Sequence, residues 1–205
     1  GESSKCIDKL KSNGVPYIMV DRPVKSDENN YGIYCNNKDG VKMGIRYLIS
    51  KNKKNIVFVE GPSRLENTKE RFYGYKEVMQ EHNLYNKSLV FQGDFNIESG
   101  IEVTKDIIKK LKNIHAIFYS NDVMAYGGMK VLLRNGYKIP EDIAIMGFDN
   151  INISKFIEPE LTTISQPIYS MGRKACEMII KLINKEENIN KKVYFDTELI
   201  IRKTV

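Results

Sequence analysis

The chain has 205 residues, 41% of them hydrophobic and 28% charged, a composition that is ordinary for a soluble globular protein and allows a real core. No stretch approaches the roughly 18 apolar residues of a membrane span, and the start, GESSKCIDKL, lacks the apolar centre and cleavage site of a signal peptide. We therefore expect a cytoplasmic protein with no membrane partner, whose net charge of +6 reflects a lysine-rich solvated surface.

Strand-like and helix-like segments alternate along the chain. Short apolar runs typical of strands buried on both faces are residues 15–20, 56–59, 89–91, 116–119 and 143–148. Apolar stripes with helical spacing lie between or after them, over residues 41–49, 72–79, 101–111, 123–132 and 171–182. The alternation predicts an α/β fold, with mainly parallel sheets flanked by helices on both sides.

Turn residues agree with this order of elements. Asn13 and Gly14 are expected to close a first helix, and Asn135 and Gly136 to close the helix over 123–132, because each pair suits a turn with positive φ. Pro140 then prevents the helix from continuing. The start at Gly1, directly in helical spacing, indicates a fragment of a longer protein.

Neither nucleic acid nor metal is expected as a direct ligand. The basic clusters fall at predicted helix ends, no aromatic side chains interleave with them, and no recognition helix or zinc-finger spacing is present. His82 and His115 have no Cys or His within metal-ligand spacing. Cys6, Cys35 and Cys176 are odd in number and widely spaced, so we expect small buried hydrophobic residues in a reducing compartment, without disulfides.

Polar side chains stand where several predicted strands end. The sequences NDVMAYG (121–127), IPEDIAIMGFDN (139–150) and PELTTISQP (159–167) carry most of them. Open α/β sheets bind ligands at the carboxyl ends of their strands. A ligand-binding α/β domain is therefore the first interpretation.

Each candidate side chain also has a purely structural alternative. Asp21 follows the first strand and is either a turn carboxylate held by its own backbone or a carboxylate aimed into a cleft. Arg71 is either half of a surface ion pair or a fixed fork of donors beside a pocket. A phenylalanine at a position like that of Phe95 is more often part of a core than a platform on which a ligand ring stacks.

The NDV sequence contains two polar residues before a predicted helix. One of Asn121 and Asp122 is expected to be the N-cap, which leaves the other polar group free, and we favour a ligand contact for Asn121. Asp149, after the strand at 143–148, has the same two interpretations.

A polyhydroxylated ring could be bound by the combination of Asp, Arg, Asn and one aromatic side chain. The same combination could bind a purine. The chain has no G-x-S-x-G, H-E-x-x-H, Walker A or G-x-G-x-x-G motif, and Gly127-Gly128 lies inside a predicted helix. No nucleophile, base or metal can be nominated. We predict a binding protein that needs no cofactor and is not an enzyme.

Eight sequences in order carry a resemblance to a known family. They are VPYIMVDR, GIRYLISKNKKNIVFVEGP, ERFYGYKEVM, GDFNIESG, SNDVMAYGGMKVLL, IPEDIAIMGFDN, PELTTISQPIYSMGRKA and TELIIRKT. The chain resembles the effector-binding domain of LacI/GalR-type bacterial transcriptional regulators.

The resemblance implies a two-lobed, periplasmic-binding-protein-like (type I) fold with an incomplete first lobe. The partial N-terminal lobe would comprise residues 1–36 and 166–196, and the C-terminal lobe residues 37–165 and 197–205. The chain would cross between lobes near 35–37, 165–166 and 196. The family's opening strands, its hinge and its helix-turn-helix would precede this sequence.

The resemblance also implies ligand positions. Asp21 matches the carboxylate of the VPxxxxD strand, Arg71 the arginine before the aromatic-Gly step, and Phe95 the aromatic of the GD-aromatic loop.

Three further positions match in the later motifs. Asn121 matches the asparagine of ND, Asp149 the aspartate of GFD, and Gln166 the glutamine at the second crossing. Asn36 departs from the family's usual Asp, and Ile168 stands where some members have an aromatic wall.

The function implied is binding of a small-molecule effector, a sugar or related polar metabolite, between the lobes, which allosterically controls operator affinity. Operator DNA would be contacted only through the absent N-terminal domain, and the regulator would be a homodimer. The alternative is a solute-binding protein of a sugar transport system. An enzyme of flavodoxin-like topology is a more distant alternative.

Overall fold

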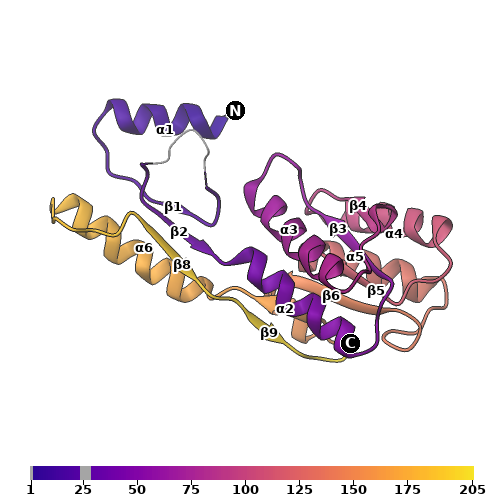
Figure 1. Ribbon diagram of the computed structural model, residues 1–205. Coiled ribbons are helices and arrows are strands. Elements are labelled where there is room, and N and C mark those ends of the chain that lie inside the picture. The colour runs from indigo at the N-terminus through magenta and orange to yellow at the C-terminus, as the bar shows by residue number, and fades with distance from the viewer. Residues whose placement is uncertain (1, 24–28) are drawn as a thin grey trace. The chain divides into compact units, whose positions relative to one another are not determined.

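The computed structural model describes residues 2–23 and 29–205 and divides into two compact units (Figure 1). The first unit comprises Gly1–Asn36 and Pro167–Asp196, and the second comprises Asn37–Gln166 and Thr197–Val205. The chain therefore passes from one unit to the other after Asn36, after Gln166 and after Asp196. Each unit has its own sheet.

The second unit is built on a six-stranded sheet in the order β4-β3-β5-β6-β7-β9. The strands are β3 (Ile56–Glu60), β4 (Val90–Gln92), β5 (Ala116–Tyr119), β6 (Ala144–Asp149), β7 (Thr162–Ser165) and β9 (Glu198–Ile200). All neighbours pair in parallel except β9, which is antiparallel to β7 at the sheet edge. The mainly parallel sheet predicted from the apolar runs is confirmed.

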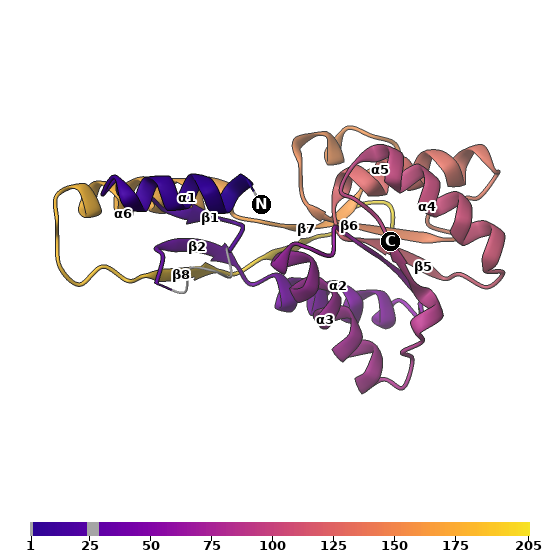
Figure 2. The ribbon, with the colours of Figure 1, turned by 90° about the horizontal axis from the view of Figure 1, so that it is seen from above.

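Helices cover both faces of this sheet (Figure 2). On one face lie α2 (Asn37–Ser50) and α3 (Glu66–Glu81), and on the other α4 (Ile97–Lys110) and α5 (Asp122–Arg134). Alternate side chains of each strand enter opposite cores, so that Ile56 and Phe58 pack under α2 and α3 whereas Val57 and Val59 pack under α4 and α5. Short 3-10 helices, η1 (Lys87–Leu89) and η2 (Asn152–Lys155), complete the unit.

Gly127 and Gly128 allow α5 to pack closely against its neighbours. A Cβ atom on Gly127 would lie 2.4 Å from the carbonyl oxygen of Ile97, and one on Gly128 would lie 2.0 Å from the hydroxyl of Tyr119. Neither position has room for a side chain. The glycine pair within this helix therefore has a packing role.

The first unit contains a parallel sheet in the order β1-β2-β8, formed by Met19–Val20, Gly32–Cys35 and Lys192–Phe195. Its helices are α1 (Glu2–Ser12) and α6 (Ile168–Ile183). Buried Ile33, Cys35, Met171 and Met178 form its small core. Gly14 follows α1 with φ +62°, the left-handed conformation expected for a turn after a helix.

Several strands differ from the sequence prediction. The run 15–20 forms a strand only at its last two residues, since Pro16 has no N–H to donate to a ladder and Val15 is 45% exposed. The strands β2, β7, β8 and β9 were not among the predicted runs. The threonines give β7 a polar sequence that does not indicate a buried strand, although Thr162 and Thr163 are fully buried.

The prediction that all three cysteines are buried is correct only for Cys35. Cys6 and Cys176 are exposed, because they occupy the solvent-facing sides of α1 and α6. His115 accepts backbone hydrogen bonds from residues 54 and 55 through Nδ1. Within residues 2–23 and 29–205, no group of three or more His, Cys, Asp or Glu side chains could hold a metal ion, and no helix is long and apolar enough to cross a membrane.

Candidate ligand-binding site

Arg71 is the centre of a polar cluster at the carboxyl ends of the strands of the second unit. It projects from α3 and is only 2% exposed. Its Nε donates to Oδ1 of Asn37 at 2.9 Å, its Nη1 to the carbonyl oxygen of Ser120 at 2.5 Å, and its Nη2 to Oδ1 of Asp149 at 3.5 Å. The alternative of a surface ion pair is thus excluded, and the guanidinium is a fixed fork of donors.

Aromatic rings complete the surroundings of this guanidinium. Its carbon lies 3.7 Å from the ring centroid of Phe148 and 5.9 Å from that of Phe95. A cation within about 6 Å of an aromatic face is stabilised electrostatically, and more strongly where water is excluded. The orientation of Arg71 is therefore fixed before any ligand binds.

Asp149 is the partly exposed acid of the cluster. It ends β6 with φ +111°, a left-handed conformation that a non-glycine residue rarely adopts, and its side chain is 26% exposed. Its Oδ1 accepts a hydrogen bond of 2.7 Å from Nε2 of Gln166 and one from Arg71. Arg71 and Gln166, which are 95 residues apart along the chain, thus donate to the same carboxylate oxygen of Asp149.

Three hydrogen bonds hold the loop after Asp149 in place. Asn150, at φ +54°, accepts from Nη2 of Arg202 at 2.7 Å and donates to Oγ of Ser165 at 3.1 Å. The backbone N–H of Ile151 donates to Oδ2 of Asp122 at 3.0 Å. A left-handed backbone conformation persists in a non-glycine residue where the surrounding structure enforces it, and such residues cluster at ligand sites.

Asn121 is the N-cap of α5. This confirms the prediction that either Asn121 or Asp122 caps this helix. Its Oδ1 accepts from the backbone N–H of Met124 at 2.9 Å, and its Nδ2 donates to the carbonyl oxygen of Phe95 at 3.0 Å. The side chain is 6% exposed. Asn121 therefore joins the start of α5 to the loop that carries Phe95, and a ligand contact for it stays a prediction.

Phe95 has the left-handed φ of +59° and packs, partly buried, against the core beneath α4 and α5. Its ring also lies beside Arg71. It is thus a core aromatic at the edge of the polar cluster, and its use as a stacking platform for a ligand stays a prediction.

Asp122 is fully buried and turned into the protein. Its carboxylate accepts from Oγ1 of Thr163 at 2.5 Å, from Oγ of Ser154 at 2.6 Å and from Ile151 N–H. Burial raises the pKa of this carboxyl to about 6, although the three donors oppose the shift. Asp122, the polar residue that does not cap α5, therefore has a structural role, since it joins α5, η2 and β7.

This raised pKa leads to a prediction about pH. Since the folded chain binds the Asp122 proton more tightly than the unfolded chain does, the contribution of this group to the free energy of unfolding is greatest below about pH 4 and falls as pH rises to about 6. The shift of about 2 units corresponds to about 3 kcal/mol. We expect Asp122→Asn to remove this pH-dependent contribution to the free energy of unfolding.

Urea unfolding of both proteins at several pH values checks the prediction. The stability of the wild type relative to Asp122→Asn should decrease by about 2 kcal/mol between pH 4 and pH 7. A difference that is constant across this range would contradict it.

Asp21 belongs to the first unit, where it follows β1. It has φ +66°, and its backbone N–H donates to the carbonyl oxygen of Ile33 at 2.9 Å. Its Oδ1 is buried and has no hydrogen-bond partner among residues 2–23 and 29–205. That oxygen is available for a ligand donor.

Sequence reasoning missed several polar groups near Arg71. Asn37 and Ser120 bind its guanidinium directly. Near Arg71, the buried atoms Oδ1 of Asn67, Oγ1 of Thr68 and Oγ of Ser120 have no hydrogen-bond partner among residues 2–23 and 29–205. Asn67 lies four residues before Arg71 on α3 and therefore on the same helix face, a spacing that could have indicated its place.

Comparison with known proteins agrees with this geometry. Residues 45–205 match the family model of the periplasmic binding protein-like domain. The chain belongs to this family. The resemblance to LacI-type regulators is confirmed as well, since the curated relatives are repressors of that type.

Three similar proteins illustrate the relationship. The ribose operon repressor of Halalkalibacterium halodurans is 33% identical over 93% of this chain and 56% of its own length. A structure described as the transcriptional regulator CelR–cellobiose complex has a TM-score of 0.90 at 27% identity, over 96% of this chain and 61% of its own. A LacI family regulator from Enterococcus faecium with bound ribose has a TM-score of 0.87 at 25% identity, over 96% and 73%.

The chain spans little more than half the length of the curated relatives that it matches. Those relatives are named as repressors and regulators, in line with the prediction of a protein that is not an enzyme.

Proposed function

We propose that this chain is the effector-binding region of a LacI-type transcriptional regulator and that its effector is a sugar or a related small polar metabolite. The observation that carries the proposal is the preorganised cluster of Arg71, Asp149 and Gln166 at the strand ends of the second unit. Buried donors and an exposed carboxylate at this edge of a parallel sheet suit a ligand with several hydroxyl groups.

The proposed ligand contacts divide according to charge. Asp149 accepts from ligand hydroxyl groups, while Arg71 and Gln166 hold the carboxylate in place and donate to ligand oxygens. Phe95 covers an apolar C–H face of the ring. Asp21 is proposed as a second acceptor because its buried Oδ1 has no partner among the described residues, and Asn121 as a contributor beside Phe95.

Ligand binding would act on the full-length regulator through a shift between conformations. An effector changes operator affinity only if its free energy of binding differs between those conformations. DNA binding would reside in a further domain, and we propose a cytoplasmic homodimer. Structures of similar regulators with cellobiose and with ribose support the choice of a sugar over other ligands, and the repressor names of the relatives favour a regulator over a transporter's solute-binding protein.

Calorimetric titration of the 205-residue chain with ribose, cellobiose and a panel of nucleosides tests the proposal. We expect saturable binding of at least one of them, weakened at least tenfold in Asp149→Asn, because a charged acceptor contributes about 1.5–3 kcal/mol. Asp39→Asn, which changes a carboxylate that is 73% exposed in the same unit, is the control. Absence of binding across the panel, or equal affinity in the two variants, would refute the proposal.

A further inference from the structure

Glu60 is a carboxylate at the same strand-end edge of the second unit as Arg71 and Asp149. It is the last residue of β3, and its side chain is partly buried. Among residues 2–23 and 29–205 its carboxylate forms no hydrogen bond and no ion pair. A partly buried carboxylate without a partner is costly for a fold, so its surroundings were followed from strand to strand.

Glu60 and Ser120 point to the same side of the sheet. In β3 the side chain of Phe58 packs under α2 and α3, and Glu60, two residues later, faces that side as well. β3 pairs in parallel with β5, with Val59 opposite Tyr119, and the N–H of Ser120 continues the ladder to the carbonyl oxygen of Val59. Ser120 is therefore the neighbour of Glu60 across the sheet, at a strand spacing of about 4.8 Å.

Two contacts connect this position to Arg71. The carbonyl oxygen of Ser120 accepts a hydrogen bond from Nη1 of Arg71. Gly61, which follows Glu60, lies beneath Phe95, because a Cβ atom at Gly61 would collide with the Phe95 ring. The centroid of that ring is 5.9 Å from the guanidinium carbon of Arg71. Glu60 therefore borders the polar cluster of the second unit.

The oxygen atoms around Glu60 lack donors. Oγ of Ser120 is buried and has no hydrogen-bond partner in the described ranges 2–23 and 29–205. The amide of Gln92, opposite Glu60 on β4, donates to the carbonyl oxygens of Gly61 and Gly93. An ammonium group, which has three donors and no acceptor, matches such surroundings.

The charge of Glu60 also favours a cation. Arg71 pairs with Asp149 at 3.5 Å, and in the described part of the chain neither Arg71 nor Arg64, in the loop after β3, forms an ion pair with Glu60. Burial raises the pKa of the Glu60 carboxyl, because desolvation disfavours the charged form. A cationic ligand would stabilise that form through charge-assisted hydrogen bonds, which are roughly twice as strong as those between neutral groups.

We propose that Glu60 is a specificity residue of the effector site and that it selects an effector with a protonated amino group, an amino sugar in preference to a neutral sugar. This inference rests on the proposed function. The ammonium group of the ligand donates to the carboxylate of Glu60 and to Oγ of Ser120, while the hydroxyl groups of the same ring bind Asp149 and Arg71.

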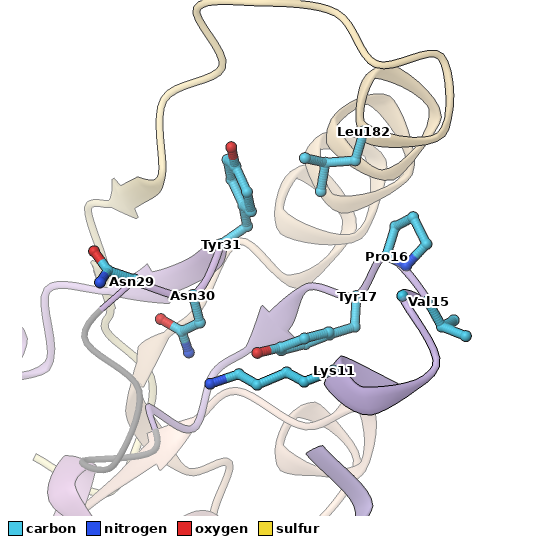
Figure 3. A pocket seen from close by; sticks show the side chains of 9 residues that line it. Lys11, Val15, Pro16, Tyr17, Asn29, Asn30, Tyr31 and Leu182 are labelled. Carbon is cyan, nitrogen blue, oxygen red and sulfur yellow. The ribbon is translucent and has the colours of Figure 1, made fainter. Parts of the chain in front are cut away.

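A cavity of about 390 Å³ in the first unit does not offer an amine the same partner (Figure 3). Figure 3 shows the side chains around it, among them Lys11, Tyr17 and Tyr31. Its described lining residues include no Asp or Glu side chain. A preference for amines that depends on a carboxylate therefore points to the second unit.

Calorimetric titration with matched pairs of sugars tests the inference. The pairs are glucosamine with glucose and galactosamine with galactose, at about pH 7, where the amine is mostly protonated. We expect at least one amino sugar to bind at least tenfold more tightly than its neutral parent, because hydrogen bonds between charged groups are the stronger ones. In Glu60→Gln this preference should fall below twofold, with the affinity for the neutral parent changed by less than threefold.

Glu102→Gln is the matched control, because it removes the same charge from a side chain on α4 that is 72% exposed, and it should keep the preference of the wild type. Glu60→Asp, which retains the charge, should keep part of it. A purely structural Glu60 would change the free energy of unfolding, measured in urea, without changing the ratio of the two affinities.

The outcomes separate this inference from the proposed function. Neutral sugars that bind without any preference for the amine, or a preference that survives in Glu60→Gln, would overturn the inference and leave the proposed function standing. Absence of binding by every sugar in both panels would overturn the two together.

Discussion

Arg71→Leu is expected to abolish effector binding and to lower the free energy of unfolding by about 3 kcal/mol. The substitution leaves the carbonyl oxygen of Ser120 and Oδ1 of Asn37 without their donor and removes the cation beside Asp149. Breaking a buried charged network by deleting one partner costs about 3–5 kcal/mol, and the exposure of Asp149 places this case at the lower end of that range.

The binding loss should exceed the effect of any single hydrogen bond. Arg71 both faces the proposed ligand and holds Asp149, so its removal disturbs two contacts at once, and we expect at least a hundredfold decrease in affinity. Arg71→Lys keeps the charge but not the planar fork, and should bind with an intermediate affinity.

Urea denaturation and calorimetry with the ligand identified from the panel measure the two effects. Arg46→Leu is the control, because Arg46 is half exposed and forms a surface ion pair with Glu81, at 3.0 Å. That change should cost no more than about 1 kcal/mol. Wild-type affinity in a folded Arg71→Leu variant would contradict the proposed site.

Gly127→Ala is expected to destabilise the second unit by about 2–3 kcal/mol, although alanine is the better helix former by about 1 kcal/mol. The new Cβ would lie 2.4 Å from the carbonyl oxygen of Ile97, a backbone atom that can move only if α4 and α5 separate. Overpacking of this kind typically costs 1–3 kcal/mol.

Gly172→Ala in α6 gives the matched comparison. A Cβ there meets nothing within 4 Å, so only helix propensity acts and the variant should be more stable by about 0.5–1 kcal/mol. Thermal or urea unfolding of the two variants should therefore give changes of opposite sign. A stabilised Gly127→Ala variant would show that α4 and α5 do not pack as closely as described.

The apolar runs identified the central strands because those strands are buried on both faces. The prediction for β5 agrees with the structure at every residue, since 116–119 is uniformly apolar and fully enclosed. Strands with polar or partly exposed side chains were harder to predict. In β8 exposed and partly buried side chains alternate, and in β7 the polar threonines are buried because their hydroxyls and backbone find partners within the fold, such as Oγ1 of Thr163 on Asp122.

The strand-end rule selects Asp149 and Asn121 as candidates from the sequence, and the family motifs add Gln166 as a further candidate. Local sequence could not show that the N-cap would be Asn121 or that Asp122 would turn inward to bind Ser154 and Thr163. Those partners lie 32 and 41 residues away from Asp122, so no pattern in the neighbourhood of NDV reveals them.

By itself, the sequence determined the class of this protein, since the order of apolar runs and turn residues and the eight motifs are properties of local chain segments. The tertiary structure decided which polar groups act together. Arg71 on a helix, Asp149 after β6 and Gln166 after β7 become one cluster only when parallel strands align their carboxyl ends at the same edge of the sheet. Burial, which depends on every surrounding element, then determines that Arg71 is enclosed and that Asp122 holds its proton more tightly.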